Sequence, residues 1–341
     1  MKKIINWGII GLGSAANNLA KQFVKIDNSN LLAIASLSKA KRDYYLKTYN
    51  LNSKNIYSNY DDIFYNKDID IIYVALPNSF HEKYCLRALE NNKNVLVEKP
   101  LTFSKESFSK IKDQFFKKKI YLEEGTANKF HPFYKKIFNS LRNIDFNKIN
   151  YIKSSFGYDA LGGKKIFNLR LKKINYNKRL FNRDLLGGSI LDGGIYPVSL
   201  LIDILDFFNI NLNEIKLINC KKIIKNNIDL ESILELSVSN TKIELKTSLI
   251  NQLENNLIVN SEKEKIIFKN IFNMDINTSI KINSKNNCSE LTNSYLENSY
   301  FYEVKNTSEL LLNKNTDFNI LQKLFLKIEK NNNLLSKWYK Y

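Results

Sequence analysis

The sequence predicts two domains: an α/β domain with a doubly wound parallel sheet, then an α+β domain with a mostly antiparallel open sheet. Three observations predict this arrangement. Strands alternate with helices up to about residue 124, the first strand runs directly into a glycine-rich turn, and from residue 149 strands with alternating polar and apolar residues follow one another. We therefore expect domains at 1–124 and 125–341, and 341 residues are enough for a core in each.

The composition indicates a globular protein with a strong excess of positive charge. Hydrophobic residues at 44% exclude a mainly disordered chain. A net charge of +18 would ordinarily indicate nucleic acid, but only six basic residues are arginines and the lysines are spread along the whole chain. We therefore expect no specific nucleic-acid partner, although the positive field would attract an anionic cofactor or substrate.

The cysteines predict neither a disulfide framework nor a metal site. Cys85, Cys220 and Cys288 are far apart and form no closely spaced pair. A reducing compartment is the simpler assumption, so we expect a cytoplasmic protein. No window approaches about 18 uninterrupted apolar residues, and we expect no membrane span.

The first strand, residues 4–10, is followed at once by the turn Gly11-Leu12-Gly13-Ser14-Ala15-Ala16 and by helical spacing over residues 17–26. This is the context in which a G-x-G-x-x-A pattern indicates dinucleotide binding. Gly11 would allow the tight turn and Gly13 the approach of a pyrophosphate, which backbone N–H groups of Ser14 and Ala15 would face. We expect a Rossmann-type domain.

The end of the second strand, residues 31–36, indicates which nicotinamide cofactor binds. An NAD enzyme usually carries Asp or Glu there, to bind the ribose 2′-hydroxyl. This chain has Ser36 and Ser38, followed by Lys39 and Arg42, so nothing repels a 2′-phosphate. The expected cofactor is NADP(H), with NAD(H) as the alternative. Ser38 could equally be the N-cap of the next helix, with the lysines on its solvated face.

A further strand, residues 69–75, ends in a stretch that carries Pro77, Asn78 and His81 before a helix over residues 82–91. These three residues would lie at the carboxyl edge of the sheet, beside the path of the nicotinamide, and we include them in the cofactor site. His81 could carry a proton, or it could be a structural residue in the first turn of the helix.

The stretch Asn94 to Pro100 is a short buried strand that ends in Glu98 and Lys99. In a parallel doubly wound sheet Lys99 would project into the ligand site, whereas the alternative is a solvated lysine at a turn. Glu98 would point the other way and organise the loop around Pro100, and we include both Glu98 and Lys99 in the cofactor site. A helix over residues 105–119 and a strand over residues 120–124 complete the domain.

In the second domain a helix over residues 133–142 precedes successive strands. They are expected at residues 149–158, 215–224, 230–239, 242–250, 256–260 and 265–269. An antiparallel sheet of this kind leaves one face open, which indicates a homodimer or homotetramer formed through the sheet.

A glycine-rich stretch, residues 187–196, begins a helix expected to run from Ser189 through Leu205. Asp192 and Tyr196 are spaced i, i+4 and would share a helical face. An acid and a phenol there could grip a substrate hydroxyl and relay its proton. The alternative is an aspartate of the first helical turn and a packed tyrosine.

Three separated motifs together resemble the glucose-fructose oxidoreductase and inositol dehydrogenase (Gfo/Idh/MocA) family. They are Gly11 to Ala16, Glu98-Lys99-Pro100, and Gly187 to Tyr196. Tyrosine at position 196, where many members carry histidine, is similar to the branch of dimeric dihydrodiol dehydrogenases and NADP-linked xylose dehydrogenases. The likeness covers nearly the whole chain.

This resemblance implies an α/β Rossmann N-terminal domain, a C-terminal domain on an antiparallel sheet, a nicotinamide cofactor, and oxidation of a hydroxyl on a sugar or related diol. It also implies that Lys99 contacts the reacting hydroxyl and that Asp192 is a substrate-site acid. A phenol with an unperturbed pKa near 10 needs a neighbouring cation to accept a proton, so Lys99 would assist Tyr196, with Lys99 itself as the alternative base.

The chain departs from the family pattern at two places. The family commonly has three glycines before the Asp-bearing helix, and Leu186 replaces the first of them. Residues 36–38 lack the arginine that NADP-using relatives often carry. Because a fold does not guarantee chemistry, the alternative to an enzyme is a catalytically silent nicotinamide-binding sensor or scaffold.

Overall fold

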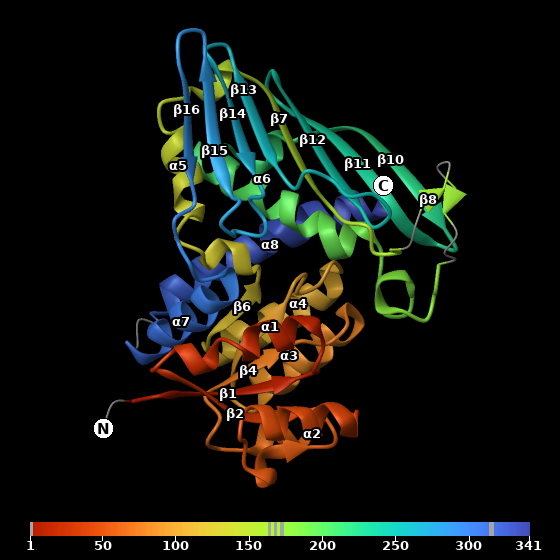
Figure 1. Ribbon diagram of the computed structural model, residues 1–341, viewed down its shortest axis with the longest axis vertical. Coiled ribbons are helices and arrows are strands. Elements are labelled where there is room, and N and C mark those ends of the chain that lie inside the picture. Colours follow the sequence, from red (N-terminus) through yellow and green to blue (C-terminus); the bar gives the residue numbers. More distant parts are fainter. Residues whose placement is uncertain (1–2, 163–164, 167–168, 171–173, 314–316) are drawn as a thin grey trace. The chain divides into compact units, whose positions relative to one another are not determined.

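The computed structural model describes residues 3–162, 165–166, 169–170, 174–313 and 317–341 (Figure 1). The chain forms two compact units. Unit 1 comprises Met1–Phe130 and Ser299–Asn332, and unit 2 comprises His131–Asn298 and Asn333–Tyr341. The sequence-based division at residue 124 assigned residues 299–332 to the second domain, whereas their contacts group them with the first.

Unit 1 contains a parallel sheet with the strand order β3-β2-β1-β4-β5-β6. The strands are β1 (Ile5–Ile10), β2 (Ser29–Ala35), β3 (Ile56–Tyr57), β4 (Ile71–Val74), β5 (Asn94–Glu98) and β6 (Leu122–Gly125). The order reverses between β1 and β4, and ligands bind at such a point, beyond the carboxyl ends of the strands. The predicted doubly wound parallel sheet is confirmed.

Some helices of this unit connect its strands, and others come from the C-terminal part of the chain. They are α1 (Ser14–Ala20), α2 (Lys39–Thr48), α3 (His81–Glu90), α4 (Lys105–Lys118), α7 (Ser299–Leu312) and the part of α8 (Phe318–Lys340) up to Asn332. The helix expected over residues 17–26 was wrong in its extent, because α1 ends at Ala20 and a separate 3₁₀ turn covers Phe23–Lys25. The ring of Phe325 in α8 stacks on Phe115 of α4, with centroids 4.4 Å apart.

Helix α7 packs on unit 1 through a face that is mostly polar. Its buried residues are Ser299, Glu303, Val304, Thr307 and Ser308. The indole Nε1 of Trp7 donates a hydrogen bond of 3.0 Å to the Ser308 hydroxyl, and the Ser29 hydroxyl donates one of 2.8 Å to the same oxygen. Hydrogen bonds therefore help to hold this helix in place, whereas most helices pack mainly through apolar side chains.

Three carboxyl groups lie where α7 meets the carboxyl ends of β5 and β6. The Tyr73 hydroxyl donates to Glu98, and the Tyr121 hydroxyl donates to Glu123. Glu303 is fully buried, and neither of its carboxyl oxygens has a hydrogen-bond partner among the residues that the structure describes. Burial, and then the charges of Glu98 and Glu123, hold the pKa of Glu303 well above its ordinary value, and burial raises the pKa of Glu123 to about 7.

Replacing Glu303 with glutamine is expected to stabilise the protein in a pH-dependent way. A carboxyl whose pKa is raised on folding binds its proton more tightly in the folded state, so its contribution to the free energy of unfolding falls as pH rises above its ordinary pKa of 4.5. The gain of Glu303→Gln over wild type should be near zero at about pH 4 and grow to about 1–3 kcal/mol at pH 8. Urea unfolding at a series of pH values measures it.

The matched control is Glu309→Gln, which changes an exposed carboxylate on the same helix. Its effect should stay small at every pH, because an exposed group has nearly the same environment in both states. A Glu303→Gln gain that does not vary with pH would show that Glu303 is not protonated on folding.

Unit 2 contains an eight-stranded sheet with the order β10-β11-β12-β7-β13-β14-β15-β16. The strands are β7 (Ile149–Gly157), β10 (Lys216–Lys225), β11 (Ile228–Val238), β12 (Thr241–Ser248), β13 (Leu257–Ser261), β14 (Glu264–Lys269), β15 (Ser279–Ser284) and β16 (Cys288–Thr292). Only β7 and β12 pair in parallel. The six predicted strands and the mostly antiparallel character are confirmed, whereas β15 and β16 were not predicted.

The other elements of unit 2 are α5 (Tyr134–Leu141), α6 (Ile195–Phe207) and a small two-stranded sheet of β8 (Lys165–Ile166) and β9 (Leu169–Arg170). Helix α6 packs against β7 and β12, so it covers one face of the large sheet. On strand β11 buried and half-buried residues alternate along the chain, as expected for a sheet with one less buried face.

A groove of about 850 Å³ crosses this sheet, lined by residues of β7, β10, β11, β12, β13 and β14. Apolar side chains such as Ile218 and Ile258 line it beside charged ones, including Lys153 and Glu244, which form an ion pair of 3.8 Å.

None of the helices within the described ranges is long and apolar enough to cross a membrane.

Candidate functional site

The glycine turn of unit 1 connects β1 to α1. Gly11 has φ +84°, and a Cβ there would lie 2.5 Å from the carbonyl oxygen of Ala75, so both conformation and space require glycine. Gly13 is exposed, and a Cβ on it would meet nothing within 4 Å. Gly13 is also the N-cap of α1, and because glycine has no side chain, no capping group covers the first N–H groups of the helix. The turn therefore presents open space beside the first helical N–H groups, including those of Ser14 and Ala15, which fits a pyrophosphate.

The segment after β2 is organised by its own hydrogen bonds. The Ser36 hydroxyl accepts from the Ser38 N–H at 3.2 Å, and the Ser38 hydroxyl accepts from the Lys41 N–H at 3.4 Å. Ser38 is thus the N-cap of α2, the alternative given above. The Arg42 guanidinium donates to the Ser36 carbonyl at 2.5 Å, while Lys39 is exposed. No carboxylate occurs among residues 36–38, so nothing within this segment repels a 2′-phosphate.

Lys99 lies at the carboxyl end of β5 and is half-buried. The Lys99–Pro100 peptide bond is cis. The loop is anchored on both sides of this lysine: Glu98 accepts from Tyr73, and the Leu101 N–H donates a bond of 2.8 Å to the Glu124 carboxylate. Glu98 therefore organises the strand end, as its position predicts.

Pro77 and Asn78 follow β4, which pairs with β5, so their loop and that of Lys99 leave the sheet at the same edge. His81 begins α3 and is fully buried. Its Nε2 lies 2.9 Å from the Leu76 carbonyl oxygen and its Nδ1 lies 2.8 Å from the Pro100 carbonyl oxygen. Both ring nitrogens face backbone oxygens, which favours the structural alternative for this histidine.

In unit 2 the helix expected from Ser189 begins differently. Residues Ile190–Gly194 form a π-helical turn, and α6 starts only at Ile195. Asp229, on β11, anchors the turn: its carboxylate accepts from the Ser189 hydroxyl and the Ile190 N–H, each at 2.7 Å. A Cβ on Gly188 would lie 2.2 Å from the Asp229 carboxylate, so this close approach needs glycine. Single π turns in a helix are frequent at functional sites.

Asp192 lies within this π turn, and its side chain is only 6% exposed. One carboxylate oxygen accepts from the Tyr158 hydroxyl at 2.6 Å, and the other accepts from the Arg179 guanidinium at 2.9 Å. Burial, and then the charge of Asp192, raise the pKa of Tyr158, so this phenol stays protonated and acts as a donor. Sequence reasoning missed Tyr158; its one signal was a polar aromatic residue directly after a strand.

Tyr196 lies on α6 and is half-buried. Its ring packs against Phe156 with centroids 4.4 Å apart, and against Phe272 at 5.6 Å. The neighbouring charge of Tyr196 contributes to the raised pKa of Tyr158, so the two phenols are close enough to interact. The unit thus gathers a buried carboxylate, a guanidinium and two phenols around one helix start.

Leu186, the departure from the glycine pattern, has φ +54°. The backbone at this position is left-handed although the residue is leucine, and this conformation costs about 1–2 kcal/mol. Leu186→Gly should raise the free energy of unfolding by about 0.5–1 kcal/mol, since the greater freedom of glycine in the unfolded chain offsets part of the relief. Denaturant unfolding measures this, and a loss of stability would show that the leucine side chain outweighs the strain. Leu185→Gly, with negative φ, should destabilise.

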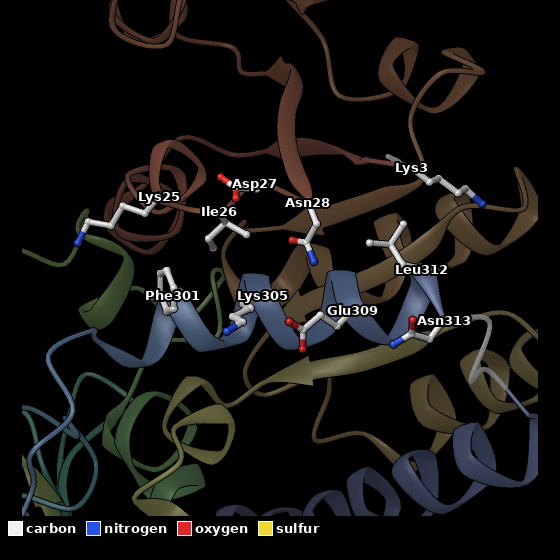
Figure 2. A pocket seen from close by; sticks show the side chains of 10 residues that line it. All are labelled: Lys3, Lys25, Ile26, Asp27, Asn28, Phe301, Lys305, Glu309, Leu312 and Asn313. Atoms are coloured by element: carbon white, nitrogen blue, oxygen red, sulfur yellow. The ribbon is translucent and has the colours of Figure 1, made fainter. Parts of the chain in front are cut away.

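A separate cavity of about 420 Å³ lies in unit 1 where Lys3, Asn28 and residues of α7 meet. Lys3 and Asn28 directly precede β1 and β2, so this cavity is at the amino edge of the sheet, away from the glycine turn. Figure 2 shows Lys25 and Lys3 at opposite ends of the row of lining side chains, and their ammonium groups do not converge.

In the described parts of the chain, no group of three or more His, Cys, Asp or Glu residues could hold a metal ion.

Comparison with known proteins gives one family match. Residues 5–125 match the family model described as "Oxidoreductase family, NAD-binding Rossmann fold". This stretch contains the glycine turn and Lys99.

Two curated relatives are similar over part of their length. The chain is 26% identical over 155 residues to a trans-1,2-dihydrobenzene-1,2-diol dehydrogenase of Xenopus tropicalis, which is 45% of this chain and 46% of the relative. It is 28% identical over 138 residues to a D-xylose 1-dehydrogenase (NADP(+)) of Hypocrea jecorina, 38% of this chain and 35% of the relative. The chain thus spans less than half the length of these relatives.

Among solved structures, the chain is similar to KijD10, a 3-ketoreductase from Actinomadura kijaniata in complex with NADP and TDP-benzene. The TM-score is 0.81 at 16% identity, covering 98% of this chain and 96% of that one. At this identity the likeness shows the fold alone, and it extends to both units.

Proposed function

We propose that the chain is an NAD(P)-dependent oxidoreductase of the Gfo/Idh/MocA family, whose NAD-binding Rossmann model residues 5–125 match. It transfers a hydride between a nicotinamide and a hydroxyl-bearing carbon of a sugar, a sugar derivative or a related diol. The observation that carries the proposal is the open phosphate-binding turn at Gly11 and Gly13, on the same edge of one parallel sheet as Lys99.

The preferred cofactor in this proposal is NADP(H). The absence of a carboxylate among residues 36–38, together with exposed Lys39, supports it. The xylose dehydrogenase relative, which uses NADP(+), and the NADP bound to the structural neighbour KijD10 also support it. The turn from Gly11 to Ala15 would hold the pyrophosphate, and Pro77 and Asn78 would flank the nicotinamide.

The bound nicotinamide supplies a hydride acceptor or donor at its C4. Oxidation must also remove the hydroxyl proton, and we assign that step to Tyr196, with Lys99 contacting the hydroxyl and lowering the phenol's pKa by its charge. Lys99 as the base is the alternative. Asp192 would bind substrate as an acceptor, held in place by Tyr158 and Arg179.

The test of this function is turnover with defined substrates. Purified protein is assayed with NADP⁺ and NAD⁺ against D-xylose, trans-1,2-dihydrobenzene-1,2-diol and glucose 6-phosphate, and with NADPH against the matching carbonyl compounds. We expect NADPH binding and at least one oxidation or reduction. Cofactor binding without turnover on a broad sugar and diol panel would favour the silent sensor, and no cofactor binding would contradict the proposal altogether.

We further propose that the chain forms a homodimer or homotetramer through the less buried face of the large sheet. The groove across that sheet and exposed Ile218, 58% accessible on β10, support this. Ile218→Asp should shift the species seen by analytical ultracentrifugation to the monomer. Ile276→Asp, at an isoleucine outside the groove that is 68% accessible, is the control. A wild-type monomer, or an oligomer that survives Ile218→Asp, would contradict the assignment.

The free cysteines Cys85, Cys220 and Cys288 support a reducing, cytoplasmic location. We assign no nucleic-acid partner to the charge of +18, because it is spread along the chain. Tight binding to DNA at physiological salt would contradict this assignment.

A further inference from the structure

One buried imidazole joins the two loops that leave the sheet on either side of the proposed nicotinamide position. The first loop follows β4 and carries Pro77 and Asn78, and the second follows β5 and carries Lys99. His81 reaches the first at the Leu76 carbonyl (2.9 Å) and the second at the Pro100 carbonyl (2.8 Å). The contacts therefore link backbone to backbone across two neighbouring strands through a single rigid ring.

Both carbonyls lie beyond the ends of their strands, because β4 ends at Val74 and β5 ends at Glu98. The ladder between the two strands ends before them and supplies neither carbonyl with a donor. A buried carbonyl without a donor is costly. The imidazole ring places its two nitrogens on opposite sides: the neutral ring donates its one N–H to one of the two carbonyls, and the protonated ring donates to both.

The geometry also excludes a different role. His81 is fully buried, so its ring does not face solvent or an open substrate site within unit 1. A proton carrier must reach the proton it transfers directly or through one water. The other anchors of the second loop, Glu124 at the Leu101 N–H and Tyr73 at Glu98, hold it from the β6 side and from the sheet. The histidine ties it to the Pro77 loop.

We propose that His81 is a positioning residue that sets Lys99 against the nicotinamide-binding loop by bridging the Leu76 and Pro100 carbonyls. The inference rests on the proposed function for the role of Lys99. Loss of the bridge leaves the glycine turn and the segment from Ser36 to Arg42 intact, so the adenosine half of the cofactor still binds. The nicotinamide half loses its fixed surroundings.

The experiment compares His81→Ala and His81→Asn with His131→Ala in the full chain. The chain has only two histidines, and His131 is a matched control: it is 1% exposed, accepts from the Phe133 N–H at 3.1 Å, and contacts the Glu297 carbonyl at 3.3 Å, all in unit 2. His81→Asn can place an amide N–H near the Pro100 carbonyl, where Nδ1 lies, and should restore part of the function. Each protein is measured for thermal unfolding, for affinity to NADPH and to 2′,5′-ADP by fluorescence, and for turnover.

His81→Ala should lower NADPH affinity about tenfold while 2′,5′-ADP affinity is unchanged, and should lower kcat about a hundredfold, the scale of a misplacement near 1 Å. His81→Asn should lie between this variant and wild type. His131→Ala should lose thermal stability without changing the ratio of the two affinities.

The proposal is overturned if His81→Ala leaves the ratio of NADPH to 2′,5′-ADP affinity unchanged, or if His131→Ala changes it equally. It is also overturned if the pH profile of turnover loses a limb in His81→Asn, since that would make the ring a proton carrier. If wild type turns over no substrate and the ratio still falls in His81→Ala, the dehydrogenase function fails while the bridge stands.

Discussion

Lys99→Met is expected to lower turnover by about 10²–10⁴-fold while NADPH affinity stays within about twofold. Methionine keeps the length and the apolar stem of the side chain and removes its charge. The proposed reaction needs that charge to bind the hydroxyl and to make a phenol acidic enough to accept a proton. In the proposed complex the cofactor phosphates would face the glycine turn, which this change does not touch.

Steady-state kinetics and NADPH fluorescence titration check this expectation. Lys105→Met, at the exposed first residue of α4, is the control for loss of one positive charge near the same sheet edge. Turnover in Lys99→Met equal to that of wild type would remove the lysine from the mechanism. A parallel loss in Lys105→Met would assign the effect to the overall field of the protein and not to a direct contact.

Asp192→Asn should have the second largest effect, on both activity and stability. The carboxylate is nearly buried and accepts from Tyr158 and Arg179, so the amide leaves the guanidinium without its charge partner and turns one acceptor into a donor. We expect the free energy of unfolding to fall by about 1–3 kcal/mol, less than for a fully buried pair because the Arg179 side chain is 41% exposed. Turnover should fall at least about tenfold, with a raised KM for substrate.

A double-mutant cycle with Tyr158→Phe makes this expectation specific. The two changes remove the same hydrogen bond, so their stability effects should be less than additive, with a coupling of about 0.5–3 kcal/mol. Asp184→Asn, an exposed carboxylate in the same stretch, is the control and should be nearly neutral. Additive losses in the cycle would mean that the Tyr158 contact does not hold Asp192.

The features that could be predicted from the sequence are those that depend on residues next to one another in the chain. A strand, a tight turn and a helix in immediate succession specified the Gly11 turn, because the positive φ and the lack of space for a Cβ both exclude other residues there. The alternation of polar and apolar residues located the strands of unit 2. The end of the Lys99 strand followed from Pro100, which cannot continue the ladder.

What depends on distant partners could not be read in this way. Val304 is the one apolar residue among the five that helix α7 buries, and apolar residues such as Tyr300 and Leu311 are only partly buried against the core, so its apolar pattern does not identify the face that packs on the sheet. Strand β16 is exposed at every residue and lacks alternation. The hydrogen bond from Tyr158 to Asp192 joins residues 34 positions apart in the sequence. It exists only after β7 and the π turn have formed.

The path of the chain has a consequence for the order of events on the ribosome. The Ser308 hydroxyl that Trp7 needs emerges 301 residues after Trp7 itself. The strands of the parallel sheet are therefore translated first, but the helix α7 that packs on them is made only after every strand of unit 2. Domains commonly fold in the order of their synthesis. Here neither unit can be completed before the end of the chain is made, because unit 2 includes Asn333–Tyr341 and the buried indole of Trp338 donates a hydrogen bond of 2.7 Å to the Ser232 hydroxyl. The first unit is made earliest, so its strands wait longest for their closing helix and are the part most in need of chaperone protection.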